Sequence, residues 1–213
     1  MKKFQFILFL SCFILLSCGK NSDQEKNQED NLPLKKMGEE FDKSKSAKDM
    51  ISEMPDLKEN TDRLRKMQPI STADLKDFFP EKLYDLERKK FSVGDSRSFF
   101  NLTQGEASYG NDGDQQIKII VTDGAGETGS GIIAPAIWAL KKDAKNHSEE
   151  RINRSLQKDG HFMKIYQSQN DEHIDSSLEM EVDNRFLVKI EAQNLTAEEL
   201  EKVYQELDFY KLK

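Results

Sequence analysis

Apolar and polar residues alternate along much of the second half of the chain. The alternation is clearest at Leu178, Met180 and Val182, and it resumes over 186–192 after the turn residues Asp183 and Asn184. Since successive side chains of a strand point to opposite faces of a sheet, this pattern predicts a β-hairpin. Further strands are expected at 86–93, 102–109, 117–121, 152–156 and 161–167.

Other segments have helical spacing. Thr196 and Glu199 form a capping box, which is typical of a helix start. The apolar residues that follow share one helical face, and they are Leu200, Val203, Tyr204 and Leu207. Shorter helices are expected over 72–79, after Ser71, and over 132–140.

The order of these elements predicts the fold class. A helix is followed by three strands, a helix, four strands and a last helix. Because hairpins dominate this order, neighbouring strands should be antiparallel. We therefore predict an α+β domain over 69–213, with a mostly antiparallel sheet of about six or seven strands and helices packed on one of its faces.

The chain before residue 69 has a different composition. Residues 1–17 combine two lysines with an apolar run, which is typical of a cleaved signal peptide and too short for a resident membrane helix. Residues 18–36 are nearly free of apolar side chains and predict a disordered spacer. Apolar residues are sparse but helically spaced over 37–68, where Pro55 is expected to separate two helical segments.

The sequence Leu15-Leu16-Ser17-Cys18 resembles the lipobox of bacterial lipoproteins. This resemblance implies cleavage between Ser17 and Cys18 and the attachment of acyl chains, such as palmitate, to Cys18. Gly19 stands where aspartate retains enterobacterial lipoproteins in the inner membrane, so the resemblance favours the outer membrane. The alternative is ordinary signal cleavage nearby, with Cys18 left as a free thiol. The sequence leaves the choice between the periplasmic and the surface face open.

Charge and cysteine content narrow the functional classes. The formal net charge of −7 argues against a nucleic-acid partner. The chain has only two cysteines, Cys12 in the signal segment and Cys18 at the acylation position. The folded domain should therefore contain neither a disulfide nor a cysteine nucleophile.

One glycine pattern could indicate a cofactor. Residues 124–129 spell G-x-G-x-x-G after a predicted strand. We interpret 124–131, from Gly124 to Gly131, as a flexible loop, because Glu127 would repel a pyrophosphate and the flanking hairpins lack a parallel strand pair. No cofactor is expected. Asp112, Asp114 and Asp123 lack the closing glutamate of a calcium loop, so no metal is expected either.

The remaining candidates for chemistry are few. His147, His161 and His173 have neither metal-ligand nor catalytic spacing and are interpreted as surface residues. The single Trp138 lies in the apolar segment 132–140, where core packing is expected and contact with a ligand is the alternative.

A second resemblance is to small bacterial envelope proteins of unknown function. It is carried by the order of the segments 79–88, 105–109, 117–123 and 185–191 before a final helix, and it implies no activity and no site residues. We therefore expect a cell-envelope lipoprotein, anchored to the membrane by acyl chains, whose domain binds a protein or a small amphiphilic partner. The alternative is an envelope hydrolase with a site near 124–131.

Overall fold

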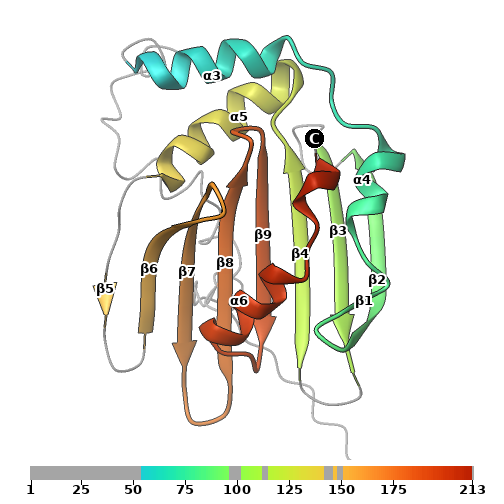
Figure 1. Ribbon diagram of the computed structural model, residues 1–213, viewed down its shortest axis with the longest axis vertical. Coiled ribbons are helices and arrows are strands. Elements are labelled where there is room, and N and C mark those ends of the chain that lie inside the picture. Colours follow the sequence, from blue (N-terminus) through green and yellow to red (C-terminus); the bar gives the residue numbers. More distant parts are fainter. Residues whose placement is uncertain (1–53, 96–101, 112–114, 142–145, 148–150, 213) are drawn as a thin grey trace, which may run out of the picture.

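The computed structural model describes residues 54–95, 102–111, 115–141, 146–147 and 151–212. They form one open antiparallel sheet with helices around it (Figure 1). The strands are β1 (Lys82–Leu83), β2 (Leu86–Asp95), β3 (Thr103–Gly110), β4 (Gln116–Asp123), β5 (Asn146–His147), β6 (Arg151–Lys158), β7 (His161–Gln169), β8 (Ile174–Val182) and β9 (Phe186–Gln193).

The sheet confirms the predicted α+β class and antiparallel pairing, but it has more strands than predicted. The described residues form nine strands, in the order β1-β2-β3-β4-β9-β8-β7-β6-β5. The prediction missed the edge strands β1 and β5, because a strand of two residues has no alternation to recognise. The pairing of β4 with β9 places the two hairpin regions side by side in one sheet.

The helices are α3 (Pro55–Arg65), α4 (Thr72–Phe78), α5 (Gly126–Leu140) and α6 (Ala197–Gln205), followed by the 3-10 turn η1 (Phe209–Leu212). Pro55, which was predicted to separate two helical segments, is the first residue of α3. Proline is tolerated there because the backbone N–H groups of the first turn have no acceptor within the helix. The capping box of Thr196 and Glu199 forms as predicted. Among the described residues, no helix is long and apolar enough to cross a membrane.

The prediction of a flexible loop over the glycine-rich segment 124–131 is wrong. Helix α5 begins at Gly126, so most of the expected loop is helical. A Cβ at Gly124 would lie 2.7 Å from the carbonyl oxygen of Arg185, and one at Gly129 would lie 2.8 Å from the backbone of Gly124. These glycines therefore allow two backbone segments to approach closely, and their spacing does not indicate a flexible loop.

The main apolar core lies on one face of the sheet. Helix α6 crosses this face (Figure 1), and α4 and η1 cover the part near β2. The buried strand residues of this core are Leu83, Leu86, Ala107, Tyr109, Ile117, Ile119, Val121, Met163, Ile165, Leu178, Met180, Val182, Phe186, Val188, Ile190 and Ala192. The alternate residues on the opposite face include charged pairs, such as Lys118 with Glu106 at 3.3 Å.

Helices α3 and α5 form a second layer beyond the ends of the central strands (Figure 1). The buried residues Leu57, Leu64 and Ala134 pack together there, with Met67 and Trp138 against them. The end of α5 pairs with Glu181, which faces away from the main core. The sequence predicted helices on one face of the sheet, but the helices are not confined to one face. Helix α3 also packs on the domain, although the domain was predicted to begin only at residue 69.

Several predictions fall on residues that the structure does not describe. The signal peptide 1–17, the cleavage point at Ser17 and Cys18, the spacer 18–36 and the first part of 37–68 all lie outside the described residues, as do Asp112 and Asp114.

Candidate functional site

A hollow of about 320 Å³ lies between α3, α5 and the turn that joins β8 to β9. One side is apolar and is formed by Leu57, Ala134, Ile137 and Trp138. The other side is polar and is formed by Asp56, Asn60, Lys141 and Asn184. Trp138 packs against the small cluster and also lines the hollow, and its contact with a ligand stays a prediction.

The β8–β9 turn forms one wall of this hollow. Asp183 and Asn184 adopt φ angles of +53° and +52°, and the N–H of Arg185 donates to the carbonyl of Val182 at 2.9 Å. Two successive left-handed residues are the geometry of a tight hairpin turn, which Asp and Asn tolerate better than other side chains. The sequence predicted this turn, and the structure places it directly beneath α3.

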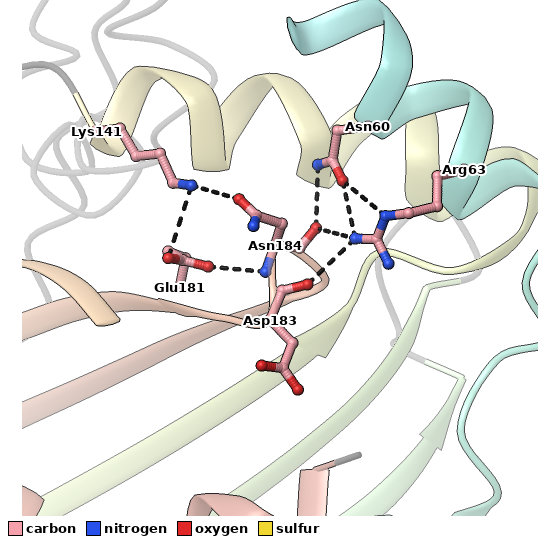
Figure 2. Close-up of polar contacts among 6 residues, drawn as sticks. All are labelled: Asn60, Arg63, Lys141, Glu181, Asp183 and Asn184. Carbon is pink, nitrogen blue, oxygen red and sulfur yellow. Dashed lines mark hydrogen bonds and ion pairs between the residues drawn. The ribbon is translucent and has the colours of Figure 1, made fainter. Parts of the chain in front are cut away.

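Helix α3 holds the turn through its polar face (Figure 2). Arg63 Nη2 donates to the carbonyl oxygens of Asp183 at 3.2 Å and Asn184 at 3.0 Å. The side-chain amide of Asn60 donates to the same Asn184 oxygen at 3.0 Å, and its own oxygen accepts from Arg63 at 2.9 Å. Because the turn presents two adjacent carbonyls, one guanidinium can bind both.

A lysine at the end of α5 holds the turn from the other side (Figure 2). Lys141 Nζ donates to the Asn184 side-chain oxygen and lies 3.7 Å from a carboxylate oxygen of Glu181. The other Glu181 oxygen accepts the backbone N–H of Asn184 at 2.8 Å. The Glu181 side chain is only 6% exposed, so the ammonium compensates a buried negative charge.

This arrangement is suited to binding a molecule with one apolar and one polar end. An ammonium group has three N–H donors, and Lys141 has two partners among the described residues. Its third donor can therefore bond an oxygen of a ligand whose apolar part lies against Trp138 and Ile137. Trp138 could be singled out from the sequence, but Asn60, Arg63, Lys141 and Glu181 could not. The turn contacts of Asn60 and Arg63 join residues 120 or more positions apart, and that of Lys141 joins residues 43 positions apart, so no local pattern connects them.

The region near the glycine-rich segment contains a buried carboxylate, but its geometry is that of a structural tie. Asp123 accepts two bonds from Arg185 at 2.8 Å, one from the Ile70 N–H at 2.7 Å and one from the Ala125 N–H at 2.9 Å. Each oxygen thus already accepts two hydrogen bonds. The nearby Ser130 hydroxyl donates to the Glu127 carbonyl within the helix at 3.0 Å. This Asp123 therefore has no geometry for activating a nucleophile.

The histidines are scattered. His173 is exposed and lies 3.4 Å from Asp175, and His161 borders a different hollow, beside η1. The side chain of His147 lies outside what the structure describes. Within the described ranges, no group of three or more His, Cys, Asp or Glu residues could hold a metal ion.

Comparison with known proteins adds no assignment to this geometry. No protein-family model, no curated protein and no solved structure matches the chain.

Proposed function

We propose that this chain is a lipid-anchored envelope protein whose domain binds a small amphiphilic molecule in the hollow between α3 and α5. The observation that carries the proposal is the position of an apolar wall beside an ammonium group in one hollow of about 320 Å³. Ligand pockets are typically mostly apolar clefts of about 300 to 1,000 Å³ with a few placed polar groups. The ligand of this hollow is an alkyl or acyl chain with an oxygen acceptor at one end.

The lipid anchor rests on the lipobox-like sequence that ends at Cys18. Replacing Cys18 with Ala removes the thiol that would be acylated. The variant should leave the detergent phase in a phase-separation assay and lose labelling by a palmitate analogue. Replacing Cys12 with Ala, which also removes a thiol but leaves residues 15–18 unchanged, serves as the control. If the Cys18→Ala chain still partitions and labels like the parent, the lipoprotein proposal is wrong.

The ligand proposal can be tested with the fluorescence of the single tryptophan. Trp138 lines the hollow, and no other Trp contributes to the signal. Titration of the Cys18→Ala chain, which needs no detergent, with sodium octanoate below its micelle concentration should give a saturable change in emission. Hexanoate should bind roughly tenfold more weakly, because each buried methylene contributes about 0.8 kcal/mol. If octanoate and octanol both leave the emission unchanged, the proposal fails.

A matched pair of lysine variants tests the polar end. Lys141→Gln should weaken octanoate binding about tenfold, since a hydrogen bond to a charged group contributes about 1.5 kcal/mol, and should leave octanol binding nearly unchanged. Lys118→Gln is the control, because its side chain has similar exposure, 40% against 38%, and also pairs with a glutamate. Equal weakening of octanoate binding by both variants would show that Lys141 does not bind the head group.

A further inference from the structure

A second and larger hollow, of about 670 Å³, lies beside the same β8–β9 turn. It is bordered by the β6–β7 turn, the end of α6 and η1, and Val182 and Asp183 form its boundary with the turn. The hollow between α3 and α5 includes Asn184 but shares none of these residues. The two hollows are therefore separate sites with different linings.

Aromatic rings form much of this second hollow. Tyr204 and Phe209 stack with their centroids 5.3 Å apart, and the His161 ring lies 5.6 Å from Phe209. Tyr210 stands at the margin with 78% of its surface exposed. The faces of aromatic rings carry partial negative charge, so such a lining attracts cations as well as apolar groups.

The charged residues of this lining all have one sign. Four carboxylates border the hollow, and they are Asp159, Asp183, Glu206 and Asp208. Neither a lysine nor an arginine is among its lining residues, and His161 is the one basic side chain there. The Asp183 carboxylate points away from the contacts that hold its backbone to α3 (Figure 2). A cation that enters the hollow therefore meets carboxylates beside aromatic rings.

The ring of Tyr204 stays neutral at physiological pH. Its hydroxyl donates to Asp159 at 3.1 Å, and burial, followed by the bond to Asp159, raises the pKa of Tyr204 to about 12. Lys158 Nζ lies 5.6 Å from the centroid of this ring, which is within the range of a cation–π attraction. That ammonium also lies 4.0 Å from Glu201, which compensates its charge.

We propose that the hollow formed by Asp159, His161, Asp183, Tyr204, Asp208 and Phe209 binds an organic cation, an ammonium or guanidinium group on a short carbon chain. Aromatic rings attract such a group, and the attraction is stronger when the group loses its water. The carboxylates add an attraction that uncharged ligands of the same shape lack. This site goes beyond the amphiphile site and does not depend on it.

The test compares two ligands of nearly equal shape by calorimetry on the full chain carrying Cys18→Ala. 1,5-Diaminopentane should bind saturably, and 1,5-pentanediol should bind at least tenfold more weakly. A third probe, the peptide acetyl-Gly-Lys-Gly-amide, distinguishes the source of the cation. Binding of the diamine alone indicates a free amine, and binding of the peptide indicates a protein side chain. If neither binds, or if the diol binds as well as the diamine, the inference is overturned.

Two variants locate the binding. Asp183→Asn keeps a side chain that tolerates the left-handed turn and should weaken diamine binding at least threefold. Phe209→Leu keeps apolar volume but removes the ring face, and it should weaken binding by a similar factor. Asp175→Asn, an exposed carboxylate on β8 away from the hollow, is the control and should have no effect. If Asp175→Asn weakens binding as much as Asp183→Asn, the cation is held by the general acidity of the surface and the proposed site is wrong.

Discussion

Helix α6 and helix α3 are attached to the sheet by different kinds of contact. Helix α6 inserts Leu200, Val203 and Tyr204 into the main core, and its start is fixed by a capping box within its own sequence. Helix α3 buries Leu57 and Leu64 in a small cluster with α5. Its polar contacts include those of Asn60 and Arg63 with the β8–β9 turn and the pair of Arg65 with the exposed Glu127 of α5.

This difference predicts an order of stability. The main core includes strands, α4, α6 and η1, so α6 can separate only if much of the domain unfolds. Helix α3 buries fewer apolar residues, and the turn carbonyls that it bonds belong to exposed residues and can be hydrated instead. Regions with few buried apolar contacts open at lower free energy than the core. We therefore expect α3 to open first, which would expose Trp138 and the amphiphile hollow.

The largest effect is expected at Asp123, which bonds the end of β4 to Ile70, between α3 and α4, and to Arg185, after the β8–β9 turn. Asp123→Ala removes the acceptor of the Ile70 N–H and leaves Arg185, whose side chain is 11% exposed, without its carboxylate. Loss of one partner of a buried ion pair should lower the free energy of unfolding by about 3 to 5 kcal/mol. Urea unfolding followed by circular dichroism measures this loss.

The control for that variant is Asp62→Ala. Asp62 pairs with Lys58 on the exposed face of α3, and exposed pairs contribute about 0 to 1 kcal/mol. A loss of less than about 1 kcal/mol for Asp123→Ala would contradict the structural role given to its bonds with Ile70 and Arg185.

The next prediction compares two leucines that are equally buried. Leu64 on α3 and Leu200 on α6 are both 0% exposed. If both helices belonged to one cooperative unit, truncation of either leucine to Ala would lower the free energy of unfolding of the whole domain by about 2 to 5 kcal/mol. We expect Leu200→Ala to shift the transitions in circular dichroism and in Trp138 fluorescence together. Leu64→Ala should instead move the fluorescence transition to lower urea than the circular dichroism transition. Coincident transitions in Leu64→Ala would show that α3 and the main core unfold as one unit.

The same contrast explains how much of the fold could be predicted from sequence. Helix α6 and the β8–β9 hairpin were predictable because their signals are local: the capping box at Thr196 and Glu199, the alternation on both strands, and turn residues at Asp183 and Asn184. The glycine-rich start of α5 was not predicted because glycine has a low helix propensity. Propensity is a weak signal, and here the close packing of Gly124 and Gly129 against neighbouring backbone outweighs it.

The candidate site was only partly predictable. Trp138 could be singled out as a rare aromatic residue in an apolar segment, but its neighbours could not. The contact of Arg63 with Asn184 depends on strand order, because β9 pairs with both β4 and β8. That order places the β8–β9 turn near α5 and so beneath α3. Periodicity identifies strands and their faces, and it does not give their order in a sheet.

The smallest expected effect tests the polar half of the α3 attachment. Arg63→Met removes the donor to the carbonyls of Asp183 and Asn184 but keeps a long apolar side chain. Since these carbonyls lie in exposed residues, water can replace the guanidinium, and the loss should be about 1 kcal/mol. That is roughly a fivefold increase in the open population of α3.

The loss should appear in one signal and not in the other. The Trp138 fluorescence transition of Arg63→Met should move to lower urea, while the circular dichroism transition of the main core stays in place, because no core contact changes. Arg65→Met is the matched control, since Arg65 lies on the same helix and, within the described ranges, pairs with exposed carboxylates on Asp62 and Glu127 and not with the turn. If Arg65→Met shifts the fluorescence transition as much as Arg63→Met does, the positive charge of α3 in general holds the helix. The hydrogen bonds of Arg63 to the turn would then add no stability of their own. If Arg63→Met shifts both signals equally, α3 is coupled to the core as tightly as α6, and the two helices differ only in how they are bonded.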